Sequence, residues 1–249
     1  MSKFQVSWRK SLAELVTIVA GVLIALMAND WRDAARDRAE ARAYEARLDQ
    51  ALASDLEEYA RAAEWADAVD SAAVEVLSAY RGQEVPAKDG KKLIEAVLRA
   101  SWMVPPTVAR DTYDDLVSTG SLALLPVALR DSVGAYYRQA QLYTDREESF
   151  KDILAGGYWR VPAVVLGPDL LPRLWKAMAA TPQGQQQEGD TLTVTAARLN
   201  GVLTRLRRIS DLETQLADVR HVMVQREVIY AVRMTTAAQR LREVLAGAK

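Results

Sequence analysis

The residues that could carry catalytic chemistry are few, and their spacing matches no catalytic arrangement. His221 is the single histidine in the 249 residues, and it lies beside Arg220 in a stretch with helical periodicity. A Ser/His/Asp triad and a histidine metal cluster therefore lack material. The absence of cysteine excludes disulfides, thiolate zinc sites and cysteine nucleophiles. We expect His221 to be a helix-surface or interface residue, and we expect no enzymatic activity.

Clustered carboxylates are the other groups that could bind a ligand, in this case a divalent cation. They are Glu57 and Glu58, Asp111 with Asp114 and Asp115, and Glu147 with Glu148. None has the spacing of an EF-hand loop or a Glu-x-x-His motif, so solvated acidic helix faces explain them better. Gly156 and Gly157 lack the further glycine and the lysine of a phosphate-binding loop. The sequence thus predicts no metal site and no cofactor.

Aromatic residues gather in the middle of the chain and could line a pocket. Because arginines lie nearby in sequence, such a pocket would suit a small anionic or aromatic ligand. Tyrosine and tryptophan are equally useful at the rim of a core or in a protein interface, so that alternative stays open. The candidate pocket residues are Trp102, Tyr113, Tyr136 and Tyr137.

Composition indicates the structural class. Lysine and arginine total 32 and the acids 33, which gives a formal net charge of −1. This balance provides no electrostatic footprint for nucleic acid. Alanine, leucine, arginine and glutamate are abundant and β-branched runs are few, so helices are predicted throughout.

The longest apolar run, Leu12 to Ala28, has the features of a membrane helix. Only Glu14 interrupts it, within the first turns, where its carboxylate reaches the headgroups. Trp8 and Trp31 flank the run about 34 Å apart at helical rise, close to the distance between the two interfacial belts of a bilayer. We expect a transmembrane anchor with these two residues as interface anchors.

A cleaved signal peptide is the alternative, because basic residues precede the run and small residues end it near Ala28. The run is longer than the usual apolar region of about 7–15 residues and contains Glu14, which favours a retained anchor. Basic residues flank both ends of the run, and a long C-terminal domain can be translocated regardless of its charge. We expect a single-pass protein of the bacterial inner membrane with a cytoplasmic N-terminus and a periplasmic C-terminal domain.

Small side chains form one ridge along this predicted membrane helix. Ala13, Thr17, Gly21 and Ala25 recur every four residues. Such a ridge lets another helix approach closely, so it predicts packing against a second copy or a partner helix. Because small residues are common in membrane helices, a chance alignment is the alternative.

The periodicity divides the chain into four parts and predicts an all-α fold. Residues 1–11 are an N-terminal tail, 12–30 the transmembrane anchor and 31–43 a charged helical stalk without an apolar stripe. From Tyr44 to Gly82 apolar residues recur every three or four positions. No helix breaker separates these segments, so anchor, stalk and first core helix are expected to be one rod. Residues 44–249 are expected to form a helical-bundle domain.

Proline and glycine divide the rest of the domain. We expect a helix at 91–102, and a segment at 113–125 in which Gly120 ends a short helix with a left-handed cap. Pro126 starts a helix that ends near Leu154. Residues 158–172 are predicted to be a packed loop, 171–180 a brief helix and 181–190 a mobile loop. One long helix is then expected from 191 to about 246, slightly bent at Gly201.

The first and last long segments carry opposite charge. Residues 31–82 contain seven arginines and twelve acids, whereas 191–249 contain ten bases and five acids. Antiparallel pairing of these helices would bring the two surfaces together, although exposed pairs add at most about 1 kcal/mol each. Two solvated faces are the alternative.

Three stretches carry a resemblance to a known family. They are the anchor, with Glu14, the run Gly21 to Leu26 and Asp30-Trp31; the segment Tyr113 to Leu122; and Leu129 to Tyr137. In this order they resemble a family of uncharacterised bacterial single-pass membrane-anchored helical proteins, catalogued as a domain of unknown function. The resemblance implies the anchored helical architecture and adds no site.

The sequence therefore predicts a membrane-anchored structural or interaction module. Its expected partners are the lipid bilayer and either further copies of the chain or another membrane protein. A membrane-tethered helical sensing domain that binds a small ligand is the alternative.

Overall fold

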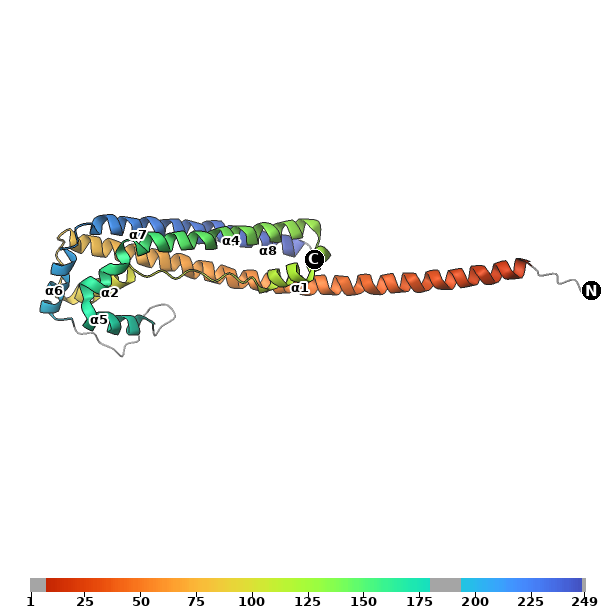
Figure 1. The fold of residues 1–249 in the computed structure, drawn as a ribbon, viewed down its shortest axis with the longest axis horizontal. Helices are drawn as coiled ribbons and strands as arrows, with labels where there is room; N and C mark the ends of the chain where they lie inside the picture. The colour runs from red at the N-terminus through yellow and green to blue at the C-terminus, as the bar shows by residue number, and fades with distance from the viewer. Residues whose placement is uncertain (1–7, 180–193, 248–249) are drawn as a thin grey trace, which may run out of the picture.

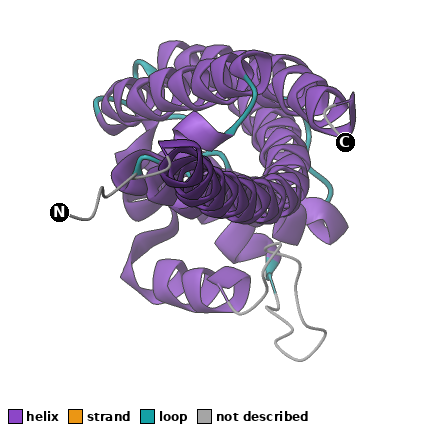
Figure 2. Ribbon diagram, turned by 90° about the vertical axis from the view of Figure 1, so that its right-hand side faces the viewer, coloured by secondary structure: helices purple, strands orange, loops and turns teal. Residues whose placement is uncertain are grey.

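The computed structural model describes residues 8–179 and 194–247. In these ranges the chain consists of helices and their connections, without a strand (Figure 2). The all-helical prediction is therefore confirmed. Residues 8–11 of the predicted tail belong to the first helix, whereas residues 1–7 and the predicted loop 181–190 lie outside the described ranges.

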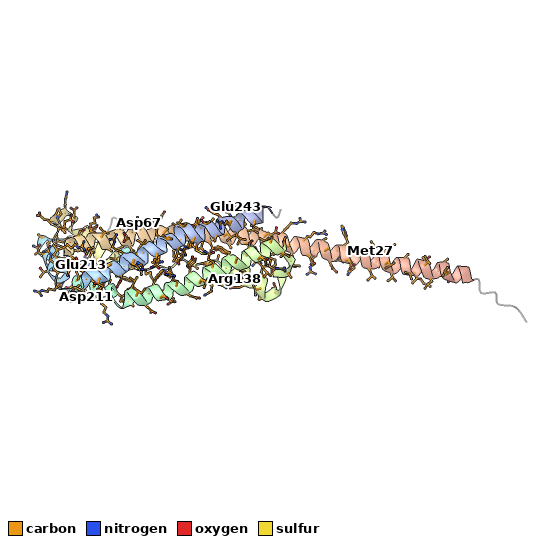
Figure 3. The ribbon with its side chains drawn as sticks, turned by 90° about the horizontal axis from the view of Figure 1, so that it is seen from above. Met27, Asp67, Arg138, Asp211, Glu213 and Glu243 are labelled. Carbon is orange, nitrogen blue, oxygen red and sulfur yellow. The ribbon has the colours of Figure 1, made fainter. Side chains whose placement is uncertain are left out.

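The longest helix, α1, runs without a break from Trp8 to Tyr80. Its 73 residues give a length of about 110 Å at about 1.5 Å per residue. The N-terminal part extends away from the other helices, and its apolar side chains are exposed on all sides; Met27, labelled in Figure 3, is 70% exposed. From Tyr44 onward one face of α1 is buried, with Leu48 and Leu52 fully covered. The predicted continuity of anchor, stalk and first core helix is thus confirmed.

Glycine ends α1 through its backbone conformation. Gly82 has φ of +95°, and the N–H groups of Gly82 and Gln83 donate to the carbonyls of Ala79 and Ser78 at 3.3 and 3.1 Å. This arrangement is a Schellman motif. The chain then reverses through η1 (Ala87–Asp89) into α2 (Gly90–Arg99), which packs on α1 and confirms the short helix predicted there.

A connection without regular structure, residues 102–110, leads along α1 to α3 (Asp111–Thr119) and η2 (Ser121–Leu124), as Figure 1 shows. These two elements hold α1 where it enters the packed helices. The Asp115 carboxylate accepts from Arg47 at 2.9 Å and from the Tyr44 hydroxyl at 3.3 Å. The Ser121 hydroxyl donates to Glu40 at 3.0 Å. Elements α3 and η2, within the segment predicted at 113–125, therefore contact the first buried turns of α1.

Three further long elements lie alongside α1. They are α4 (Val127–Ala155), α7 (Leu212–Glu227) and α8 (Thr235–Gly247), with η4 (Val228–Met234) joining the last two. Ion pairs show the direction of α7 and α8, because Glu213 pairs with Arg81, Arg220 with Asp70, and Arg242 with Asp49, at 2.7, 2.8 and 2.8 Å. Since the partner number falls as the C-terminal number rises, α7 and α8 run antiparallel to α1. All three pairs are partly exposed, so the buried apolar residues contribute most of the stability.

The predicted loop at 158–172 is wrong, because η3 (Tyr158–Arg160) and α5 (Val161–Ala179) occupy it. Pro162 lies in the first turn of α5, where its missing N–H would have had no helical partner. Gly167, with φ of +74°, divides α5 into two pieces, and Pro168 again stands at the start of a piece. Pro162 and Pro168 therefore begin helical segments, and Pro172 lies within the second piece without ending it.

The single helix predicted from 191 to 246 is also wrong. Instead, α6 (Ala196–Leu206) ends in a turn, and α7 starts in a new direction at the far end of α1, where Asp211 and Glu213 are labelled in Figure 3. The turn is held by α1: the Tyr80 hydroxyl donates to the Ile209 carbonyl at 3.2 Å. Gly201, where a bend was expected, lies within α6.

Gly120 provides a test of the left-handed cap that ends α3. It ends α3 with φ of +77°, as predicted, and a Cβ there would meet no atom within 4 Å. Gly120→Val should therefore destabilise the protein by about 1–2 kcal/mol through backbone strain alone. The measurement is urea unfolding of the detergent-solubilised chain, followed by tryptophan fluorescence.

The matched control is Gly156→Ala, where φ is −70° and added atoms make only ordinary contacts. This variant should unfold close to the wild-type midpoint. Equal stability of Gly120→Val and wild type would contradict the assignment of a strained left-handed cap to Gly120.

Candidate functional site

Side chains from three helices hold the backbone of the connection 102–110. The Arg226 guanidinium of α7 donates through Nη2 to the Val104 carbonyl at 2.7 Å. The Asp55 carboxylate of α1 accepts from the Ala109 N–H at 2.7 Å, and the Tyr137 hydroxyl of α4 donates to the Ala109 carbonyl at 3.0 Å. These three groups thereby supply hydrogen-bond partners for the backbone of an irregular, partly exposed segment beside α1.

Asp55 is the centre of one buried polar network. It is completely buried, and its Oδ2 accepts from the Tyr136 hydroxyl at 2.6 Å. The Tyr136 and Tyr59 hydroxyl oxygens lie 2.8 Å apart. Because Tyr136 gives its one hydrogen to Asp55, Tyr59 must be the donor to Tyr136. Burial raises the pKa of both tyrosines, so both hydroxyls keep their hydrogens at neutral pH.

Glu147 and Arg226 form a second buried network. Arg226 Nε donates to Glu147 Oε1 at 2.9 Å, and their side chains are 0% and 4% exposed, in that order. The Tyr230 hydroxyl donates to the same oxygen at 2.6 Å. Glu147 Oε2 and Arg226 Nη1 have no partner among the described residues. The interpretation of Glu147 as part of a solvated acidic face is therefore wrong, because its side chain is buried against partners from a helix distant in sequence. Glu148, in contrast, is exposed and pairs with Lys151.

A π-helix places Tyr230 beside Glu147. The helix from α7 to α8 widens at η4, Val228–Met234, and the Thr235 hydroxyl donates to the Tyr230 carbonyl at 2.7 Å. Single π-turns are rare within α-helices and are found frequently at functional sites. The widened turn also brings Met234 to the same interior region as Tyr230.

A cavity of about 140 Å³ lies where these elements meet. Tyr59 of α1, Ala140 and Glu147 of α4, and Tyr230 of η4 form its buried floor. The connection 102–110 supplies one wall. The remaining lining residues are Pro105, Pro106, Val108, Tyr143, Thr144, Glu148, Lys151 and Met234. This cavity is the candidate ligand site, because it combines apolar walls, tyrosine rings and a buried carboxylate.

The aromatic residues singled out in the sequence lie in two groups. Tyr113 stacks on Tyr137 with ring centroids 4.4 Å apart, and Tyr136 meets Tyr137 edge to face at 5.0 Å. Trp102 instead packs between Trp65 and Trp175, at 5.4 and 5.1 Å. Tyr136 does not line the cavity and is linked to it through Tyr59. The tyrosines that line the cavity are therefore not the predicted ones; they are Tyr59, Tyr143 and Tyr230.

The other sequence candidates lie on the surface. His221 is exposed on α7 next to Gln225. Among the described residues, no cluster of three or more histidine or carboxylate side chains could hold a metal ion. Trp31 is exposed on α1, and the side chain of Trp8 lies outside the described residues. The ridge residues Ala13, Thr17, Gly21 and Ala25 are all exposed.

The buried Asp55 gives a prediction for the pH dependence of stability. Burial raises its pKa above the ordinary value of 3.8, against the opposing effect of its hydrogen bonds. The folded protein therefore holds this proton more tightly than the unfolded chain, and Asp55 lowers the free energy of unfolding as pH rises through the interval above 3.8. Asp55→Asn keeps an acceptor for the Ala109 N–H and removes the titration.

The free energy of unfolding of wild type minus that of Asp55→Asn should decrease as pH rises above 3.8. Asp67→Asn, an exposed change on the same helix, is the control and should give a difference that stays constant with pH. A flat difference for Asp55→Asn would contradict the raised pKa.

Comparison with protein-family models, with curated proteins and with solved structures finds no match for this chain.

Proposed function

We propose that this protein is a membrane-anchored interaction module in which α1 crosses a bilayer through residues 12–28 and carries a helical bundle on one side of it. The observation that carries the proposal is the contrast within one helix. Leu12 to Ala28 is apolar and entirely exposed, whereas the part beyond Tyr44 is buried on one face. A run of this length that no other described part of the chain covers needs an apolar surrounding, and a bilayer supplies one.

The continuity of α1 supports a retained anchor over a cleaved signal peptide. Helical structure continues through Ala28 into the charged stalk without the break at which cleavage would be expected. The stalk is exposed from Trp31 to Ala39 apart from Ala34, and Glu40 makes the first contact with η2. These nine residues extend about 14 Å at helical rise. In the proposed orientation, with a cytoplasmic N-terminus, α1 holds the bundle close to the outer surface of the bacterial inner membrane.

Self-association through the small-residue ridge is the second part of the proposal. The Thr17 hydroxyl donates to the Ala13 carbonyl at 2.9 Å, which satisfies its polar group within the helix, as a membrane interior requires. The space beside Gly21 is open, with no atom within 4 Å of a Cβ placed there. A second helix can therefore approach the backbone closely along this face.

A membrane-tethered sensing domain is the second candidate function. It is favoured by the cavity at Tyr59, because the same helix that lines the cavity continues into the proposed anchor. A ligand there would contact α1 directly.

The anchor is tested by placing charge in the apolar run. The double variant Val19→Arg, Leu23→Arg adds two arginines, each of which costs about 2.5–3.5 kcal/mol of insertion free energy at the centre of a membrane helix. The full-length variant should move from the carbonate-resistant membrane fraction to the soluble or degraded fraction. Ala35→Arg with Ala39→Arg, on the exposed stalk, should remain in the membrane.

Protease treatment of spheroplasts and mass spectrometry of the N-terminus complete this test. We expect external protease to digest the C-terminal domain, and we expect the mature chain to begin before Leu12. A mature N-terminus near Asn29, or carbonate release of the wild type, would overturn the anchor.

The ridge is tested by a pair of substitutions one residue apart. Gly21→Ile places a branched side chain on the ridge, whereas Val22→Ile adds one carbon beside it. The association constant of the full chain in lipid vesicles, measured by energy transfer between labelled copies, should fall about tenfold for Gly21→Ile and change little for Val22→Ile. Equal constants for the two variants, or a monomeric wild type, would exclude the ridge.

A further inference from the structure

The hydroxyl groups of Tyr59, Tyr230 and Thr144, which line the cavity, can accept hydrogen bonds from a ligand but have no hydrogen left to donate. The Tyr59 hydroxyl donates to Tyr136, and the Tyr230 hydroxyl donates to Glu147 Oε1 at 2.6 Å. The Thr144 hydroxyl donates to the Ala140 carbonyl at 3.1 Å. Each hydroxyl has one hydrogen, and each is already used. Oxygen lone pairs are what these three groups have left to offer a ligand.

Glu147 adds a further acceptor beside the cavity. Its Oε1 receives both Arg226 and Tyr230, whereas its Oε2 has no partner among the described residues. The side chain is 4% exposed, so bulk water does not replace the missing partner. A buried carboxylate oxygen without a hydrogen bond loses free energy that a donor would restore. Arg226 Nη1 also lacks a partner among the described residues, but Arg226 does not line the cavity, whereas Glu147 does. A charged N–H donor makes a stronger hydrogen bond to a carboxylate oxygen than a neutral donor does.

The walls suit a cation with an alkyl body. The rings of Tyr59, Tyr143 and Tyr230 border the cavity, together with Val108 and Met234. The Tyr59 and Tyr230 rings stack on each other with centroids 5.8 Å apart, and the Arg226 guanidinium lies 5.8 Å from the Tyr230 centroid. A tyrosine ring face attracts a cation, most strongly where the cation is shielded from water. Two prolines from the connection 102–110 complete an apolar surface for carbon atoms.

We propose that this cavity binds a small organic ammonium ion, a primary or secondary alkylamine whose N–H groups donate to Glu147 and to the tyrosine oxygens. The volume of about 140 Å³ sets the size. A cavity of about 150 Å³ holds benzene, so the ligand has up to about six non-hydrogen atoms. An anion would find its donors only at the mouth, where Lys151 is paired with Glu148 and the Tyr143 hydroxyl accepts from Arg233.

This inference goes beyond the proposed interaction function and holds whether or not α1 lies in a bilayer. Its test uses the full chain purified in detergent, with isothermal titration calorimetry at constant ionic strength. The three probes are n-butylammonium, n-butanol and tetramethylammonium. They separate a cation with N–H donors from a neutral molecule of the same length and from a cation without donors.

We expect n-butylammonium to bind saturably in a one-to-one ratio. Its affinity should exceed those of n-butanol and tetramethylammonium at least about tenfold, because only n-butylammonium combines charge with several donors. Equal affinity for n-butanol would show an apolar cavity without selectivity for cations, and equal affinity for tetramethylammonium would show that the oxygen acceptors are not used. Either outcome, or no saturable binding of n-butylammonium, would overturn the proposal.

Two variants test whether the amine binds in this cavity. Ala140→Val adds two carbons to the buried floor and should weaken n-butylammonium binding at least about tenfold by occupying the cavity. Ala135→Val makes the same change on an exposed face of α4 and should leave binding unchanged. Unchanged affinity in a folded Ala140→Val protein would remove the ligand from this cavity.

Thr144→Val provides a second test of the binding site, and this test does not depend on whether the Ala140→Val protein folds. It replaces one acceptor oxygen by a carbon at nearly constant volume, on an exposed turn of α4. The affinity for n-butylammonium should fall several-fold, while the affinity for n-butanol should change less, because the alcohol has one hydrogen to donate. Equal losses for both probes would contradict recognition through the acceptors.

Discussion

The structure depends on one unbroken helix whose two parts are covered differently. In α1 the residues before Ala28 expose apolar side chains on every side, whereas those after Tyr44 bury a single face. Because the helix is continuous, its rise and rotation fix where that buried face lies relative to the exposed apolar run. The other elements pack on this face: α7 and α8 run antiparallel to it, α2 covers its far end, and α3 with η2 clasps it at Glu40 and Arg47.

The sequence predicted the elements whose signals are local. The rod, the short helix α2, the left-handed Gly120 and the helix after Pro126 all follow from periodicity and from the backbone preferences of glycine and proline. Two segments were predicted wrongly, each for a different reason. Proline was counted as a helix breaker at 158–172, although Pro162 and Pro168 stand in first turns, where proline is tolerated, and the helix continues past Pro172. The turn between α6 and α7 receives its hydrogen bond from Tyr80, 129 residues away in sequence, which no local pattern reveals.

The residues around the cavity were also difficult to predict, because they interact with partners distant in sequence. Asp55 and Arg226 stand at core positions of their helices, three residues after Leu52 and Met223, so a charge within an apolar stripe was a signal available in the sequence. No signal in the sequence identified the partners of these charges, because Glu147 and Arg226, for example, are 79 residues apart. The π-helix adds a second obstacle: it shifts the residues after Val228 relative to a 3.6-residue period and so places Tyr230 at Glu147.

The buried polar groups also set how far the helices can slide along one another. Hydrogen bonds lose most of their strength when one helix is displaced by a single helical rise, about 1.5 Å, because they need donor–acceptor distances of about 2.7–3.2 Å. Asp55 ties α1 to α4 and to the connection 102–110, and Arg226 ties α7 to the same elements. Tyr59 and Glu147 belong to these two networks and also border the cavity. An occupant of the cavity therefore contacts the groups that fix the position of α1, and it can shift that position only by the difference in its affinity for the two arrangements.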